Sequence, residues 1–210
     1  MVATTSSELR PVLSGDAFVA RLAHLLHGGN APLALAQTDL DDLVGINERR
    51  GAAGGDLALA AWERLLDGNL PAGAEVMRLG GDEYAVLLPG LSAESALVLM
   101  EEIREHFAAH PVEGLGEAAT ASIGVAANPP HGATAEALWQ ASGQALMRAK
   151  RDGRDRVAIY VEEKMVLKSN YYPRAGLDRL AKLSGATGRT EASLLREALD
   201  DLVGKYRESL

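Results

Sequence analysis

The stretch RLGGDEYAVLLPG, residues 78–90, decides the fold. Apolar residues flank the pair Gly80 and Gly81, which predicts two strands joined by a tight turn, because glycine adopts turn conformations without a steric penalty. Asp82 and Glu83 follow directly, and adjacent carboxylates at a hairpin tip repel each other unless a cation lies beside them. A solvated acidic turn is one interpretation. The apolar strands on both sides favour another, a divalent metal ion with phosphates attached.

The composition is that of a protein with a core built from Leu, Ala and Val. The 210 residues are 47% hydrophobic and 4% aromatic, enough for one domain or two. The absence of cysteine excludes disulfides, thiolate catalysis and Cys-ligated zinc, and it is consistent with a cytoplasmic location. We expect no membrane segment, because no apolar run approaches the roughly 20 residues that a spanning helix needs. Residues 1–14 are polar and lack the features of a signal peptide, so we expect an N-terminal tail.

The charge is unevenly distributed. The net charge of −8 argues against a protein that coats nucleic acid by charge alone. Residues 1–160 hold 12 Lys and Arg against 21 Asp and Glu, whereas residues 161–210 hold 9 against 8. The acidic excess lies in the first part, which indicates two units with different roles.

Hydrophobic periodicity and turn residues predict an α+β fold for residues 15–160, an antiparallel sheet with helices packed on it. The expected elements are a helix from Asp16 to about His27, a strand at 32–40, a short helix opened by Asp41 and Asp42, a glycine break at 51–55, a helix from Asp56, the hairpin, a helix capped by Ser92, a small-residue strand at 118–127, a helix at 134–151 and a strand at 156–160.

Acidic and basic residues fall at the ends of these elements. If the strand ending in Asp39 lies beside the hairpin, Asp39, Asp82 and Glu83 converge at one edge of the sheet. That arrangement can hold two Mg²⁺ ions against a triphosphate. Lys150 and Arg154, at the end of the last helix, could neutralise phosphates from the other side.

Five segments together resemble the GGDEF domain of diguanylate cyclases, which condense two GTP into cyclic di-GMP. The resemblance covers about residues 15–160. The segments are GGDEY (80–84), with Tyr in place of Phe, DLDDLVGIN (39–47), GAAGGD (51–56), SIGVA (122–126) and AKRDGRDR (149–156). Any one of them alone would be a weak signal.

The resemblance implies a magnesium or manganese site at the hairpin. Asp39 and Asp82 would bind metal through their side chains and Leu40 through its carbonyl. Glu83 would support the metals or the deprotonation of the 3′-hydroxyl, which makes Asp82 and Glu83 the candidate catalytic residues.

The resemblance also implies a GTP site. Asn47 and Asp56 would hydrogen-bond the guanine edge, while Lys150 and Arg154 would hold phosphates. Each site carries one GTP, so two domains must face each other for the reaction.

Several positions depart from the family pattern. Val44 stands where the family usually has a lysine thought to steady the transition state, and valine cannot supply a charge. Met147 and Gly143 replace a usual Tyr and Asp, PVLSGDAF replaces the usual opening, and Pro71 and Ala74 occupy the positions of the Arg-x-x-Asp product-inhibition site. Two functions stay open: an active cyclase, or a weak or inactive domain that senses GTP or cyclic di-GMP.

Residues 161–210 predict a second, smaller unit. The pattern indicates a strand at 164–172, a helix at 174–184, a turn at Gly185 and Gly188, and a helix from Thr190 to about Tyr206. About 45 residues cannot bury this much leucine alone, so we expect a homodimer.

This unit resembles the ribbon-helix-helix DNA-binding domain of bacterial repressors and antitoxins, over YPRAGLDRLAKLSGATGRTEASLLREALDDL (172–202). In that family, paired strands enter the major groove of double-stranded DNA and alternate side chains read bases. One strand register points Leu167, Ser169 and Tyr171 outward; a one-residue shift, which we favour, points Lys168 and Asn170 outward. Lys164, Arg189 and Thr190 are candidate phosphate contacts. The near-neutral charge leaves open a dimerisation module that never touches DNA.

Overall fold

A computed structural model describes residues 15–28, 31–162 and 172–206. The chain divides into two compact units, 1–163 and 164–210, and each is described by itself. Among the helices described, none is long and apolar enough to cross a membrane.

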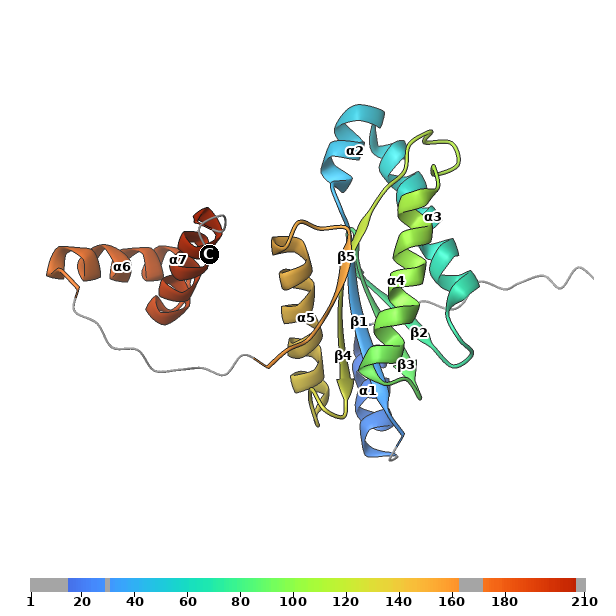
Figure 1. Ribbon diagram of the computed structural model, residues 1–210, viewed down its shortest axis with the longest axis horizontal. Coiled ribbons are helices and arrows are strands. Elements are labelled where there is room, and N and C mark those ends of the chain that lie inside the picture. The colour runs from blue at the N-terminus through green and yellow to red at the C-terminus, as the bar shows by residue number, and fades with distance from the viewer. Residues whose placement is uncertain (1–14, 29–30, 163–171, 207–210) are drawn as a thin grey trace, which may run out of the picture. The chain divides into compact units, whose positions relative to one another are not determined.

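The first unit is built on a five-stranded sheet in the order β2-β3-β1-β4-β5 (Figure 1). The strands are β1 (Leu33–Leu40), β2 (Glu75–Gly80), β3 (Glu83–Pro89), β4 (Ala121–Asn128) and β5 (Arg156–Ile159). The first three pairings are antiparallel, as predicted, but β5 runs parallel to β4, so the expectation of a purely antiparallel sheet was wrong. A helix lies between these two strands in the chain, and such a crossover returns the chain to start a strand in the same direction.

Helices cover both faces of the sheet. They are α1 (Gly15–His27), α3 (Ala52–Asn69), α4 (Ala93–Ala109) and α5 (Ala135–Arg151), while the short α2 (Leu43–Arg50) lies beyond the end of β1 and packs on α3. Because side chains alternate along a strand, β1 contributes to two cores. Ala34 and Ala36 pack with residues of α3 and α4, whereas Leu33 and Leu35 pack with residues of α1 and α5. The sheet is therefore the middle layer of three, with α5 and α4 on opposite sides of it in Figure 1.

The small residues of β4 let α5 approach closely, as the sequence predicted. A Cβ placed on Gly124 would lie 2.0 Å from the backbone nitrogen of Leu146 and 2.3 Å from the carbonyl oxygen of Ser142. Only a glycine at this position allows the helix backbone to rest directly on the strand.

The glycine-rich segment 51–55 does not break the chain as widely as expected. Only Gly51 lies outside a helix, with φ 76°, and α3 begins at Ala52. Gly54 and Gly55 lie buried within its first turn. A Cβ on Gly55 would lie 2.2 Å from Oδ1 of Asn47, so this glycine serves the close packing of α2 against α3.

The cap predicted at Ser92 is confirmed, because its side chain accepts a hydrogen bond from the backbone of Ser95. At the start of α5, Thr134 accepts a similar bond from Ala137, although the sequence predicted only the helix there and not its cap. The first helix differs, because it begins at Gly15 and already includes Asp16.

The second unit contains α6 (Arg174–Thr187) and α7 (Glu191–Lys205). Gly185 lies inside α6 and not in the turn, which is made at Gly188 with a left-handed φ of 68°. The helix α7 begins directly after Thr190, as predicted. The predicted strand at 164–172 falls mainly on residues 163–171, outside the described part of the chain, and so do Lys164, Lys168 and Asn170.

Candidate active site

The end of β1 and the tip of the hairpin meet at one edge of the sheet. Asp39 lies opposite Glu83 in the pairing of β1 with β3. One residue further on, the backbone N–H of Leu40 donates to the carbonyl oxygen of Asp82 over 3.3 Å. Gly80 pairs with Glu83, so Gly81, with φ 56°, and Asp82 form the turn itself. The strand order thus brings Asp39, Leu40, Asp82 and Glu83 together.

Arg78 and Tyr84 hold the hairpin. Arg78 donates hydrogen bonds of 2.6 and 3.1 Å to the carbonyl oxygen of Gly81, and its guanidinium lies 5.6 Å from the centre of the Tyr84 ring. The Tyr84 hydroxyl donates to Glu63 on α3 over 2.8 Å. Burial, followed by this hydrogen bond to a carboxylate, raises the pKa of Tyr84. The hairpin is therefore tied to the helix on which Asp56 lies.

Lys150 reaches from the last turn of α5 to the carboxylate of Asp39. The distance from its Nζ to Oδ2 is 2.6 Å, and the two side chains are 31% and 11% exposed. Burial raises the pKa of Asp39; Lys150 opposes that rise, and the neighbouring charges of Asp82 and Glu83 add to it. A negative site of this kind attracts a cation, and Lys150 provides one.

The oxygen donors at this edge fit a hard divalent cation. Three carboxylates and a backbone carbonyl are the ligand types that Mg²⁺ and Mn²⁺ prefer. The Lys150 ammonium on Asp39 is a stand-in for such a cation. Within the described ranges, however, no three His, Cys, Asp or Glu side chains are already grouped around one ion position.

The predicted guanine contacts lie on α2 and α3. Asn47 and Asp56 are both exposed, and Asn47 packs its amide against Gly55 at the start of α3. Val44, on the first turn of α2, is 71% exposed. A charged side chain would fit in its place without being buried.

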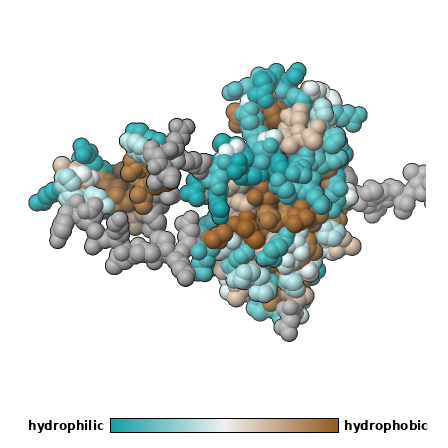
Figure 2. Space-filling model, in the orientation of Figure 1, coloured by the Kyte–Doolittle hydropathy of each residue, from teal (hydrophilic) through white to brown (hydrophobic). Residues whose placement is uncertain are grey.

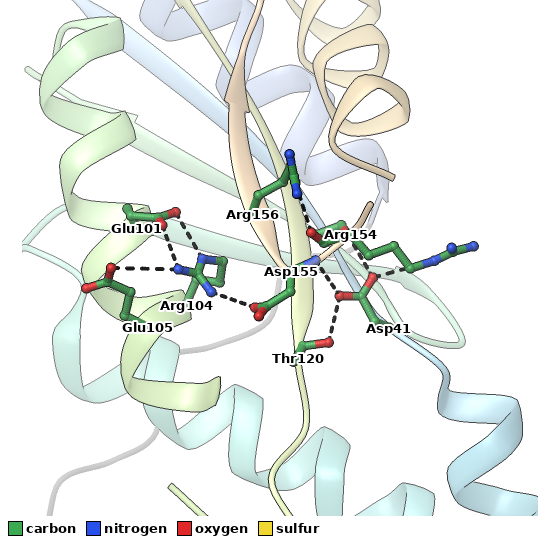
Figure 3. Close-up of polar contacts among 9 residues, drawn as sticks. Asp41, Glu101, Arg104, Glu105, Thr120, Arg154, Asp155 and Arg156 are labelled. Carbon is green, nitrogen blue, oxygen red and sulfur yellow. Dashed lines mark hydrogen bonds and ion pairs between the residues drawn. The ribbon is translucent and has the colours of Figure 1, made fainter. Parts of the chain in front are cut away.

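Arg154 lies in the loop between α5 and β5, beside a carboxylate that sequence reasoning treated only as a helix opener. Its side chain is 62% exposed, and its Nε lies 3.9 Å from Oδ1 of Asp41. Asp41 is buried and accepts hydrogen bonds from Thr120 and the backbone of Asp155 (Figure 3). It also accepts one from the Ser122 hydroxyl. Thr120 and Ser122 are polar residues in the otherwise apolar segment ATASIG (119–124). They were the sequence signal that could have indicated a buried polar partner such as Asp41.

A second group missed by the sequence reasoning lies behind the same loop. Arg104, on α4, is buried and donates to Glu101 and to Asp155, the latter over 2.5 Å (Figure 3). The hydrogen bonds to Glu101, and then that to Asp155, raise the pKa of Arg104 despite its burial. A residue pair 51 positions apart on a helix and a loop leaves no periodic trace in the sequence.

In this three-layer α+β domain, acidic residues converge at a hairpin tip and basic residues lie at a neighbouring helix end. Such an arrangement can bind a metal–nucleotide complex. The family comparison agrees: the profile of the GGDEF family, described as "Diguanylate cyclase, GGDEF domain", matches residues 15–156. The chain therefore belongs to the GGDEF family.

Curated relatives carry the same domain within longer chains. Diguanylate cyclase DgcP of Pseudomonas aeruginosa is 37% identical over 135 residues, which are 63% of this chain and 20% of the relative. Diguanylate cyclase DgcM of Escherichia coli is 39% identical over 131 residues, 60% of this chain and 32% of the relative. The chain thus matches about a fifth to a third of the length of these two proteins.

Solved structures share the fold. The active GGEEF domain of a Vibrio cholerae diguanylate cyclase superposes with a TM-score of 0.68 at 27% identity, covering 74% of this chain and all 100% of that one. The GGDEF domain of TpbB (YfiN) from Pseudomonas aeruginosa gives a TM-score of 0.68 at 32% identity, with 73% and 93% covered.

Proposed function

We propose that the chain is a diguanylate cyclase that condenses two GTP into cyclic di-GMP as a homodimer. The observation that carries the proposal is the convergence of Asp39, Asp82 and Glu83 at one edge of the sheet, with Lys150 on Asp39. The named diguanylate cyclases among its relatives support the same activity.

The metal would be held by the carboxylates of Asp39, Asp82 and Glu83 and by the carbonyl of Leu40. When bound, Mg²⁺ or Mn²⁺ would neutralise phosphate charge and lower the pKa of the attacking hydroxyl. Lys150 would exchange its contact with Asp39 for a phosphate oxygen, since phosphate and carboxylate are both anionic acceptors.

The remaining groups would orient GTP. Asn47 and Asp56 present an amide and a carboxylate, which match the acceptor and donors on the guanine edge. Arg154 would bind phosphate beside Lys150. In the reaction, the 3′-hydroxyl oxygen of one GTP forms a bond to the α-phosphorus of the other, and the bond to pyrophosphate breaks. Glu83 accepts the hydroxyl proton, and the facing domain repeats the step in the opposite direction.

The C-terminal unit would supply the dimer. Leu194 is the only buried residue among those whose burial is described in 172–206. Apolar residues gather on the surface of this unit (Figure 2). The large exposed ones are Tyr172, Leu177, Leu183, Leu195, Leu199, Leu202, Val203 and Tyr206. A second copy that covers them would bring two GGDEF domains to high effective concentration.

DNA binding through a ribbon-helix-helix fold is the finer part of the proposal, and its support is the sequence pattern of 172–202. Two helices joined at Gly188 are consistent with it. Arg189 forms an ion pair with Glu197, so a DNA phosphate would have to compete for its guanidinium. Thr190, directly before α7, would place a phosphate at the positive end of that helix.

A second function is favoured by one observation. Val44 is exposed where the family pattern has a lysine, so the transition state lacks one positive charge. A domain that binds GTP or cyclic di-GMP without rapid turnover would then act as the sensor of a DNA-binding regulator.

The deciding experiment incubates the full chain with GTP and Mg²⁺ or Mn²⁺ and separates the nucleotides by chromatography. Cyclic di-GMP and pyrophosphate in a 1:2 ratio, abolished by Asp82→Asn, would establish the cyclase. Tight GTP binding without product would establish the sensor instead. Absence of both would refute a nucleotide site.

The DNA proposal needs its own assay. A mobility shift on DNA from upstream of the protein's own coding sequence, with and without GTP or cyclic di-GMP, should give a band that Lys168→Ala weakens and Lys182→Ala does not. No shift under any condition would leave a dimerisation unit, whose dimer is measured by sedimentation.

A further inference from the structure

We propose that Asp41 is a positioning residue that holds the loop 152–155 so that Arg154 presents its guanidinium to the nucleotide phosphates, and that Asp41 binds no metal. This inference rests on the proposed nucleotide function. It assigns different roles to two carboxylates that stand two residues apart, Asp39 and Asp41.

The oxygens of Asp41 are already occupied by protein donors. Oδ1 accepts from the Ser122 hydroxyl over 2.7 Å, and Oδ2 accepts from the Thr120 hydroxyl over 2.9 Å and the Asp155 backbone N–H over 3.1 Å. Its side chain is only 4% exposed. Asp39, by contrast, has the ammonium group of Lys150 as its partner. A metal ion would have to displace three hydrogen bonds to reach Asp41, whereas it need displace only Lys150 to reach Asp39.

The loop that Asp41 holds has an unusual backbone. Gly153, Arg154 and Asp155 have consecutive φ values of 117°, 62° and 46°. Two residues with a Cβ in the left-handed region are unfavourable and persist only where surrounding contacts enforce them. The chain must reverse here within a few residues, because α5 ends at Arg151 and β5 begins at Arg156.

Contacts on opposite sides of the loop enforce this backbone (Figure 3). Asp41 accepts the N–H of Asp155, while Arg104 binds the carboxylate of the same residue over 2.5 Å. The N–H of Arg154 donates to the carbonyl of Ala149 over 3.0 Å. Asp155 is therefore fixed through both its backbone and its side chain, and Arg154 directly precedes it. The long Arg154 side chain keeps its guanidinium largely exposed and available to a ligand.

The chemistry of the arrangement follows from these contacts. An arginine binds phosphate best when its backbone is fixed in advance, because less freedom is then lost on binding. Oδ1 of Asp41 also lies 3.9 Å from Nε of Arg154. This contact orients the Nε end of the guanidinium and leaves its two terminal nitrogens for the ligand. Removing the Asp41 carboxylate would loosen the arginine without touching the nucleotide.

The test measures GTP affinity of the full chain, by displacement of a fluorescent GTP analogue in Mn²⁺, for Asp41→Asn, Arg154→Ala and the double variant. An asparagine amide cannot accept the hydrogen bonds that one carboxylate oxygen accepts now. We expect each single variant to weaken GTP binding about tenfold, the scale of one charge-assisted contact. The double variant should bind no more weakly than Arg154→Ala alone, because both changes remove the same contact.

A metal titration separates positioning from ligation. The Mn²⁺ concentration that gives half-maximal GTP binding should be unchanged in Asp41→Asn and should rise in Asp39→Asn. Glu105→Gln is the matched control: Glu105 belongs to the same network, is 67% exposed, and forms its 3.8 Å ion pair with Arg104. It should leave GTP affinity unchanged.

Three results would overturn the inference. The first is a loss of GTP affinity in the double variant equal to the product of the two single losses. The others are a raised Mn²⁺ requirement in Asp41→Asn, or unchanged GTP binding in Asp41→Asn beside a loss in Arg154→Ala. If Asp41→Asn does not fold, Arg104→Met loosens the loop from the other side. Combined with Arg154→Ala, it must then bind GTP no more weakly than Arg154→Ala alone. A wild-type chain that binds no GTP would refute the proposed function itself, which is a distinct outcome.

Discussion

Replacing Gly124 by alanine tests how the sheet places the phosphate-binding end of α5. The added Cβ would lie 2.0 Å from the backbone nitrogen of Leu146, where ordinary contact begins at 3.4 Å. The obstructing atoms belong to the helix backbone, so no rotamer change relieves the clash. The helix must retreat by about 1.4 Å, the difference between the two distances.

The expected cost is about 3 kcal/mol of unfolding free energy, the upper part of the range for overpacked cores. Because Lys150 lies on the last turn of the same helix, the variant should also weaken GTP binding in the population that remains folded. Both effects arise from one displacement, so they should appear together.

Urea unfolding followed by tryptophan fluorescence measures this directly. The chain has two tryptophans, Trp62 and Trp139, and both lie in the first unit. Gly143→Ala is the matched control, since its Cβ would meet only the end of the Gln37 side chain, at an ordinary contact distance of 3.4 Å. That helix position should gain about 0.5–1 kcal/mol from the alanine.

Equal stabilities of Gly124→Ala and the wild type, within about 0.5 kcal/mol, would refute the argument from close helix–strand contact. Destabilisation by both alanines would show that the interface tolerates no added methyl group anywhere, and the role given to Gly124 would lose its specificity.

Three further changes have expected outcomes. Val44→Lys should raise cyclase turnover at least severalfold with unfolding free energy unchanged within about 0.5 kcal/mol, because the site is exposed; unchanged product formation would remove the explanation by a missing lysine. Tyr84→Phe should cost about 1 kcal/mol in urea unfolding through loss of the hydrogen bond to Glu63, and an equally stable variant would contradict that value. Burial lowers the pKa of His131 below its ordinary 6.5, so the unfolded chain binds more protons and stability should fall as pH drops through that value; His131→Gln should flatten the profile, and an unaltered profile would assign the acid sensitivity to other groups.

The sequence predicted the strands well because their signals are local. Alternating apolar residues, the glycine pair and the helix cap at Ser92 each act within a few residues. The direction of β5 was missed for the opposite reason: four residues carry no record of whether their neighbour is parallel. The motif glycines Gly54 and Gly55 were also misread, since a glycine that permits close packing looks the same in sequence as one that ends a helix.

The candidate site also has parts that the sequence predicted and parts that it could not predict. The sequence predicted that Asp39 would meet the hairpin carboxylates if its strand lay beside the hairpin, and the pairing of Asp39 with Glu83 meets that condition. The partners of Asp41 and Arg104 could not be predicted, because they depend on which segments the sheet order brings together. A buried carboxylate satisfied by hydroxyl groups has no characteristic spacing.

The reach of the Asp41 contacts along the chain has a consequence for folding. Its hydrogen bonds join residues 79, 81 and 114 positions apart. Loops of that length close late, after local hairpins and helices have formed. A partly folded chain can therefore contain the complete GGDEY hairpin and still lack an ordered Arg154 loop. A nucleotide held by that loop would bind only the fully folded chain. It would therefore raise the free energy of unfolding in proportion to the logarithm of its concentration.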